Sequence, residues 1–272
     1  MRRKDQPTKE EKIEHLKRII ESEDYSTDYL PVLKGFMGDE DPEVRELAIS
    51  ALWDYLEPEM IDPLFDKAKN DPSQEVCSQA IITLGRYIYE GDLIDYDFDW
   101  GMIEPLMQES ELSERDFLRV KAFLLQIARD EEESLDSRRF AIEALGFLIE
   151  PEILDLIAEA YAHPDVRMKA SAIFAMGRGG SEQWAEIILK ELDSSVEEIQ
   201  YEAIRAAGEA SLSKAAPRLK QLALSDNKDL RLEAIWALGK TGGRGVSQFL
   251  ESCAQEEDED IREVAEAALE EM

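Results

Sequence analysis

The chain has 272 residues, of which 44% are hydrophobic and 34% are charged. That apolar fraction excludes global disorder, and the abundance of alanine, leucine and glutamate beside only 14 glycines and 10 prolines favours helix throughout. The 62 acidic and 31 basic side chains give a formal net charge of -31. Such a charge repels nucleic acid and anionic membranes and attracts basic partners, unless the acidic residues only solvate the outer faces of helices.

The cysteines and the N-terminal segment restrict the chemistry further. Cys77 and Cys253 are too few for a disulfide framework or a zinc cluster. The charged N-terminal segment lacks the apolar stretch of a signal peptide, and no run reaches the about 18 apolar residues of a membrane span. We therefore expect a soluble, cytoplasmic protein that binds no metal and no cofactor.

In chain order, the first predicted helix covers residues 8–21 and forms, with the tail before it, a cap over residues 1–26. From residue 27 to residue 272 the predicted helices come in pairs. The first helix of a pair has apolar residues at helical spacing and often a proline in its first turn, where proline is tolerated. We predict these first helices at residues 29–37, 61–69, 153–162, 184–192, 215–224 and 246–254.

The second helix of each pair has a recurring frame: an aliphatic residue, arginine, two variable residues, alanine, isoleucine, a variable residue, alanine and leucine. Residues 44–53 and 230–239 show this frame most clearly. Its central alanines are Ala48, Ala80, Ala122, Ala141, Ala172, Ala203, Ala234 and Ala265. From Ala141 onward each step is 31 residues, and a fixed period of this size predicts an all-α solenoid of stacked helix pairs.

The middle of the chain breaks this period. Ala80 and Ala122 are 42 residues apart, whereas Ala122 and Ala141 are only 19 apart. We therefore expect an irregular insertion of about eleven residues at 90–101, because a regular array would keep one spacing. The spacing leaves open whether residues 114–129 form the second helix of one pair or the first helix of the next.

The frame resembles the HEAT repeat, in the short form of phycobilisome-lyase-type proteins, over residues 27–272. The resemblance implies a right-handed superhelix of about seven or eight helix pairs. It also implies that the arginine of the frame pairs with a turn aspartate, which would form a ladder along the stack. That position holds Arg45, Arg119, Arg138, Arg231 and Arg262, and an interruption is expected where it holds Cys77, Lys169 and Gln200.

One face of the predicted second helices varies freely. Counted from the first aliphatic residue, offsets +2, +3, +6 and +10 lie opposite the core face, and the resemblance implies that this face lines a concave groove. The residues of interest there are Arg86, Arg139, Phe174, Arg178, Tyr201, Arg205, Trp236 and Lys240. Arginine and aromatic residues are enriched at binding hot spots, so we expect the groove to bind a protein or peptide partner. In this hypothesis the cations contact acidic or carbonyl groups and the rings are apolar anchors. The alternative is that the row only pairs with Glu202, Glu209 and Glu233.

The expected insertion holds a second candidate contact site, the acidic and aromatic residues Asp95, Asp97, Phe98, Asp99 and Trp100. The alternating carboxylates are similar to a calcium loop. A calcium loop requires glycine at its sixth position and a bidentate glutamate at its twelfth, whereas here Gly101 is seventh and Leu106 is twelfth. The segment is therefore interpreted as an inserted loop that holds no metal, with Trp100 or Phe98 packed against the solenoid and the carboxylates in solvent, or as a second contact site for a partner.

The chain has no recognisable catalytic constellation. His15 and His163 have no partner at metal-ligand spacing, and phosphate-binding and nucleophile motifs are absent from the sequence. We expect a non-enzymatic scaffold with a protein or peptide partner. The resemblance leaves two alternatives, a phycobilin lyase or chromophore chaperone and a HEAT-like DNA glycosylase, and the acidic charge opposes the second because it repels DNA.

Overall fold

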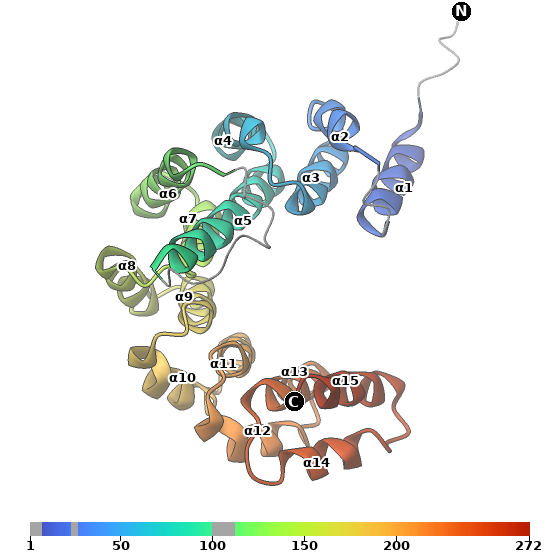
Figure 1. Ribbon diagram of the computed structural model, residues 1–272, viewed down its shortest axis with the longest axis vertical. Coiled ribbons are helices and arrows are strands. Elements are labelled where there is room, and N and C mark those ends of the chain that lie inside the picture. The colour runs from blue at the N-terminus through green and yellow to red at the C-terminus, as the bar shows by residue number, and fades with distance from the viewer. Residues whose placement is uncertain (1–6, 23–26, 100–111) are drawn as a thin grey trace, which may run out of the picture. The chain divides into compact units, whose positions relative to one another are not determined.

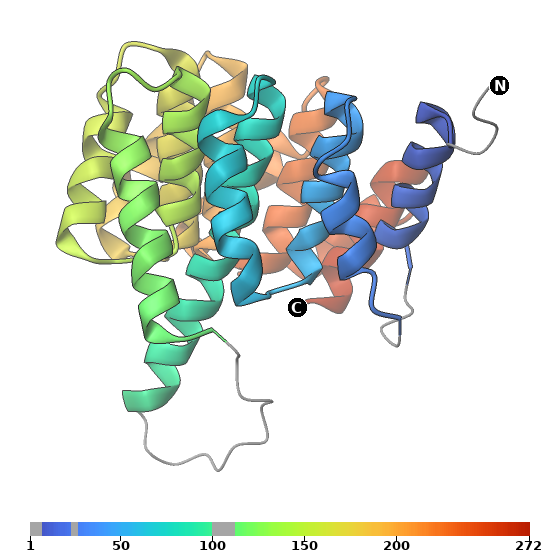
Figure 2. The same cartoon turned by 90° about the horizontal axis from the view of Figure 1, so that it is seen from above.

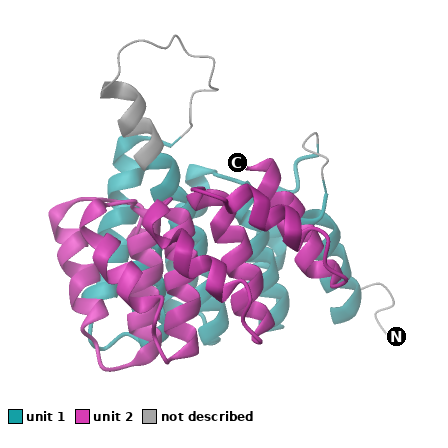
Figure 3. Cartoon of the chain, turned by 90° about the horizontal axis from the view of Figure 1, so that it is seen from below, with its two compact units in different colours: residues 1–144 teal, residues 145–272 magenta. Residues whose placement is uncertain are grey.

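The computed structural model describes residues 7–22, 27–99 and 112–272, with the side chains of residues 92–99 outside this description. The described residues form fifteen α-helices and no strand, an all-α solenoid of helix pairs. The chain divides into two compact units, Met1–Ala144 and Leu145–Met272, which Figure 3 shows in different colours. None of the described helices combines the length and the apolar character needed to cross a lipid bilayer.

Unit 1 begins with α1 (Lys9–Ile20), which confirms the first predicted helix. Thr8 and Glu11 form a reciprocal capping box at its start, and the helix packs on α3 through a face that contains Leu16 and Ile19. The helix pairs of unit 1 are α2 (Leu30–Phe36) with α3 (Pro42–Ser50), α4 (Ile61–Asn70) with α5 (Gln74–Asp99), and α6 (Glu114–Arg129) with α7 (Leu135–Leu145). Figure 2 shows α4, α5 and α6 side by side with roughly aligned axes. The expected division into a cap over 1–26 and a solenoid over 27–272 stays a prediction.

Unit 2 contains four further pairs. They are α8 (Pro151–Tyr161) with α9 (Val166–Arg178), α10 (Ala185–Glu191) with α11 (Glu197–Glu209), α12 (Ala216–Leu222) with α13 (Lys228–Thr241), and α14 (Val246–Cys253) with α15 (Glu259–Glu270). The second helices α9, α11, α13 and α15 pack on one another in that order, and each also packs on its own first helix. Figure 1 shows the resulting two layers within this unit.

Small residues hold the second helices close together. Seven central alanines of the frame are fully buried: Ala48, Ala80, Ala141, Ala172, Ala203, Ala234 and Ala265. A glycine nine positions after the start of the frame faces an alanine of the next second helix. A β-carbon at Gly177 would lie 2.6 Å from Cα of Ala206, and one at Gly239 would lie 2.9 Å from Cα of Ala268. The backbones therefore approach more closely than any larger residue at these positions would permit.

The ambiguous segment 114–129 is α6, the first helix of a pair. Phe65 of α4 stacks on Phe123 of α6 with 3.9 Å between ring centroids, so α6 lies in the layer of first helices. Ala122 is exposed and is therefore not a central alanine of the frame. Arg119, expected in the ladder, instead pairs with Asp62 and Asp116. The described residues thus contain seven helix pairs.

The segment expected as a loop is helical for most of its length. Helix α5 continues to Asp99, so Asp95, Asp97, Phe98 and Asp99 belong to a helix, while Trp100 lies outside the described residues. The continuation has a packing reason. Gly91 is buried against α6, where a β-carbon would meet the ring of Phe117.

The arginine ladder is present at two of its expected positions. Arg45 forms hydrogen bonds with Asp71 of the next turn, and Arg231 does so with Glu256 at 2.6 Å. Arg138 donates to the carbonyl of Ala128 in the last turn of α6, and Arg262 donates to the carbonyl of Glu256 in its own turn.

The expected interruptions are of two kinds. Lys169 keeps the link, because its Nζ lies 3.1 Å from the buried carboxylate of Glu191 in the next pair, so the prediction of an interruption there is wrong. Among the described residues, the side chains of Cys77 and Gln200 donate to backbone carbonyls of their own turns and to no side chain of the next pair, which matches the expectation.

Candidate partner-binding surface

An alternating row of rings and cations runs along the second-helix side of unit 2. The guanidinium carbon of Arg178 lies 4.4 Å from the ring centroids of both Phe147 and Phe174. That of Arg205 lies 4.6 Å from the Phe174 ring. Cations at this distance are attracted to the electron-rich ring faces. Three of the predicted groove residues therefore form one structural unit, in which the arginines are already engaged.

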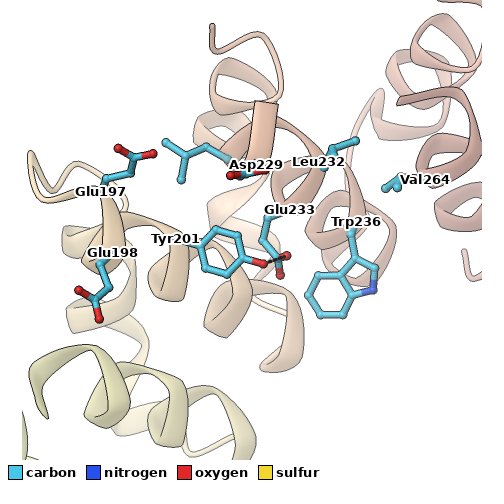
Figure 4. Close-up of a pocket in the computed structure, with 9 residues that line it drawn as sticks. Glu197, Glu198, Tyr201, Asp229, Leu232, Glu233, Trp236 and Val264 are labelled. Atoms are coloured by element: carbon cyan, nitrogen blue, oxygen red, sulfur yellow. Dashed lines mark hydrogen bonds between the residues drawn. The ribbon is translucent and has the colours of Figure 1, made fainter. Parts of the chain in front are cut away.

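Tyr201 and Glu233 connect neighbouring helices next to this row. The hydroxyl of Tyr201 in α11 donates to Oε2 of Glu233 in α13 at 2.8 Å (Figure 4). Burial and this bond to the carboxylate raise the pKa of Tyr201 to about 12. Burial likewise raises the pKa of Glu233, although the Tyr201 hydroxyl and the charge of Arg205 act in the opposite direction. The pair is a desolvated carboxylate held in place by a neutral phenol.

A groove of about 780 Å³ opens beside this pair. It is lined entirely by second helices of unit 2: by Glu197, Glu198 and Tyr201 of α11, Asp229, Leu230, Leu232, Glu233 and Trp236 of α13, and Val264 of α15. In the frame, Tyr201, Leu232, Glu233, Trp236 and Val264 are at offsets +2, +3 and +6. Figure 4 shows the carboxylate of Glu233 between the rings of Tyr201 and Trp236. The groove thus combines an apolar surface with carboxylates.

Three of the four groove carboxylates lie at the N-terminal ends of their helices. Glu197 and Glu198 are in the first turn of α11, and Asp229 is in the first turn of α13. Acidic residues at these positions stabilise a helix through its dipole, and the packing of α11 on α13 brings the two turns to one groove. Glu197 accepts a hydrogen bond from Asn227. Among the described residues, no ion pair or side-chain hydrogen bond involves the carboxylate of Glu198 or Asp229.

Trp236 and Lys240 complete the predicted row in unit 2. The indole of Trp236 lies over Gly208, because a β-carbon at Gly208 would be 2.7 Å from its Cζ3 atom. Lys240 Nζ lies 5.9 Å from the Trp236 ring centroid and 2.7 Å from Oε2 of Glu271. Of the eight predicted residues, Tyr201 and Trp236 line the groove, and Lys240 forms an ion pair with Glu271 at the end of α15.

Two predicted residues, Arg86 and Arg139, lie in unit 1. Arg86 pairs with Glu90 on the same helix and lies over the ring of Tyr89 at 5.2 Å. Arg139 pairs with Asp136 at 2.7 Å and lies over the ring of its neighbour Phe140 at 3.8 Å. Both cations thus have carboxylate partners within unit 1, and these partners differ from Glu202, Glu209 and Glu233, which the alternative interpretation named.

The histidines and cysteines have local roles. His163 Nδ1 accepts a hydrogen bond from the Asp165 amide at 3.0 Å, and the His15 ring meets the edge of Phe36. Burial raises the pKa of both buried thiols, Cys77 and Cys253, so they are held as neutral groups. In the part of the chain that the structure describes, no three histidine, cysteine or acidic side chains form a group that could hold a metal ion.

Comparison with known proteins gives a family and a fold. The model of the family described as HEAT repeats matches residues 29–94 and 185–270. Yeast importin-β (Kap95p) has a similar structure, with a TM-score of 0.55, 15% identity and coverage of 98% of this chain and 39% of that one. The complex of CpcE and CpcF of phycocyanin lyase from Nostoc sp. PCC7120 has a TM-score of 0.52 and 15% identity, over 92% of this chain and 97% of that one.

These similarities have a definite scope. The chain spans less than half the length of the importin-β chains that it matches. At 15% identity the solved structures show the fold alone. No curated protein sequence matches the chain.

Proposed function

Since the chain belongs to the HEAT-repeat family, we propose that it is a non-enzymatic scaffold that binds a protein or peptide partner through the second-helix groove of unit 2. The observation that carries the proposal is the groove itself. Tyr201, Leu232 and Trp236 line it from two adjacent helices and are only half-buried. Aromatic side chains that are fixed by neighbours and partly exposed supply binding area at low entropic cost.

The predicted row takes two roles in this proposal. Phe174, Tyr201 and Trp236 are the apolar anchors. The cations Arg178, Arg205 and Lys240 of unit 2 have ring faces or a carboxylate of the chain as partners, so we propose that they orient the rings and contact the partner at their edges. Arg86 and Arg139, which pair with carboxylates of their own helices, stay proposed contacts of unit 1. The end of α5, with Asp95, Asp97, Phe98 and Asp99, remains a second proposed contact site.

The structural neighbours support this role at the level of the fold. Solved structures similar to this chain include importin-β bound to Nup1, with a TM-score of 0.51. A solenoid of this kind can therefore hold a protein partner. The phycocyanin lyase complex keeps pigment attachment as the alternative function. The fold alone does not separate the two, so the experiment must include a pigment readout.

The test is affinity purification from an extract of the source cells with three forms of the chain. Trp236→Ala removes the larger anchor. Ile149→Ala is the matched control, because Ile149 is 61% exposed in the same unit and lies outside the groove. We expect wild type and Ile149→Ala to retain a partner at equal yield, and Trp236→Ala, with unchanged circular dichroism, to lose it by about tenfold or more, as a hot-spot residue does. Equal retention by all three forms would contradict the proposal, and bilin absorbance in the eluate would favour pigment attachment.

A further inference from the structure

The groove of unit 2 has a marked excess of negative charge at its lining. Four of its side chains are carboxylates, from Glu197, Glu198, Asp229 and Glu233, and none of its lining residues is basic. Two nearby cations already have partners within the chain. Arg205 lies over the Phe174 ring while its charge also acts on Glu233, and Lys228 pairs with Asp258 and Asp260. The field inside the groove is therefore negative and attracts cations.

The remaining lining residues suit the other features of a long basic side chain. Leu232, Trp236 and Val264 offer apolar surface for a methylene stem. The Tyr201 and Trp236 side chains lie on either side of the Glu233 carboxylate (Figure 4), so a cation that reaches this carboxylate lies close to both aromatic residues. Apolar stem surface, aromatic side chains and carboxylates together match lysine and arginine, whereas an acidic side chain would meet repulsion here.

We propose that the groove of unit 2 binds a lysine or arginine side chain presented by a basic segment of the partner protein. This inference rests on the proposed function and specifies the chemistry of the partner. The net charge of -31 would steer such a segment toward the chain at long range. The groove carboxylates and rings would then fix where the basic side chain docks.

The state of Glu233 provides an internal readout. Burial raises the pKa of this carboxyl in the free protein. A bound cation next to Glu233 favours the ionised carboxylate, so binding should lower the pKa of Glu233. At pH values close to that pKa, binding should therefore release protons. The neighbouring groups that influence the pKa of Glu233 are Tyr201, Arg205 and Glu209.

The test uses a short peptide that alternates lysine and glycine, titrated into the full chain by calorimetry and by NMR of the tryptophan indole N–H signals. The Trp236 signal is assigned by its loss in Trp236→Phe. The double variant Glu198→Gln/Asp229→Asn neutralises two groove carboxylates. The control Asp155→Asn/Glu159→Gln removes the same charge from exposed positions of α8, outside the groove. Comparing these two variants separates local recognition from attraction by the overall charge.

We expect the peptide to shift the Trp236 signal and the groove variant to weaken binding about tenfold, while the control changes it less than about twofold. Equal weakening by the two double variants, no shift at Trp236, or tighter binding of a matching glutamate–glycine peptide would overturn the inference. The two proposals fail separately. If Trp236→Ala still loses the cellular partner while the lysine peptide shows no preference for the groove, the scaffold function stands and the basic ligand is wrong.

Discussion

The guanidinium of Arg45 in α3 forms two hydrogen bonds with the carboxylate of Asp71, from Nε to Oδ2 at 2.9 Å and from Nη2 to Oδ1 at 2.6 Å. Both side chains are buried, with Arg45 8% and Asp71 1% exposed. The remaining nitrogen of Arg45 donates to the carbonyl of Asp39 at 2.9 Å. One side chain therefore fastens the second helix of a pair to its own turn and to the turn of the next pair.

The pKa of Asp71 reflects this link. Burial alone would raise it, but the hydrogen bonds from Arg45, the Ser73 amide and Lys67 outweigh burial and hold the pKa below its ordinary value. A depressed carboxyl pKa contributes stability above the unfolded value of about 3.9, and this contribution is lost as pH falls through the folded value.

Replacing Asp71 should destabilise unit 1. Asp71→Asn leaves the buried Arg45 without its counter-charge, which typically lowers the free energy of unfolding by about 3 kcal/mol at pH 7. Urea unfolding at pH 7 and at pH 3 measures the effect, and the difference from wild type should shrink at the lower pH. Asp54→Asn is the control, because Asp54 is exposed. A loss that is the same at both pH values would show that the ion pair is not its cause.

Alanine substitution at two glycines should change the stability in opposite directions, because only one of them lies in a close contact between second helices. Gly177→Ala would place a β-carbon 2.6 Å from the backbone of Ala206, so we expect a loss of about 1–3 kcal/mol in the free energy of unfolding. Gly35→Ala meets nothing within 4 Å inside α2 and should gain up to about 1 kcal/mol from helix propensity. Denaturant melts of both variants give the two signs. Equal tolerance of alanine at both positions would mean that the helices are not in close contact at Gly177.

The ring–cation row of unit 2 should contribute measurably to stability. Arg178 faces two rings, so Arg178→Gln should lower the free energy of unfolding by about 1 kcal/mol at these partly exposed positions. Arg244→Gln, at an exposed turn position before α14, should leave it unchanged. Thermal melts at two salt concentrations compare Arg178→Gln and Arg244→Gln with wild type. If Arg178→Gln melts at the same temperature as wild type, the ring–cation row does not stabilise the chain.

Ionisation of Glu233 should lower the stability of the wild type. Compared with a variant that cannot ionise at this position, the wild type should therefore lose stability between acid and neutral pH. A carboxyl pKa that burial raises above the unfolded value contributes stability below the unfolded pKa, and this is lost as pH rises through the folded pKa. Glu233→Gln keeps an oxygen for the Tyr201 hydroxyl and should therefore be at least as stable as wild type at pH 7. The advantage should vanish below about pH 4.3, the ordinary glutamate value. A variant less stable than wild type at pH 7 would refute this sign.

The 31-residue period was sufficient to predict the helix pairs of unit 2, because small residues recur wherever second helices approach each other. The same reasoning misplaced Ala122. One apolar face at helical spacing is common to first and second helices, so the pattern of residues 118–125 could not show in which layer α6 lies. Because α5 extends to Asp99, the 31-residue spacing is interrupted before α6, and this spacing could not assign α6 to a layer.

The candidate site was predicted in part. Offsets along single helices identified Tyr201 and Trp236, since both project from the variable face. The carboxylates of Glu198 and Asp229 were missed, because an acidic residue in a first helical turn is already explained by the helix dipole. Only the packing of α11 on α13 reveals that these two turns share a groove.

The most direct test of partner binding at the groove places a photo-crosslinking phenylalanine analogue at single positions. Leu232 lines the groove, whereas Leu224 is 65% exposed and lies outside it. After irradiation in a cell extract, mass spectrometry should find a partner protein joined to the chain at position 232 and not at position 224. A partner joined at 224 alone, or equally at both positions, would contradict the assignment of the second-helix groove as the binding surface.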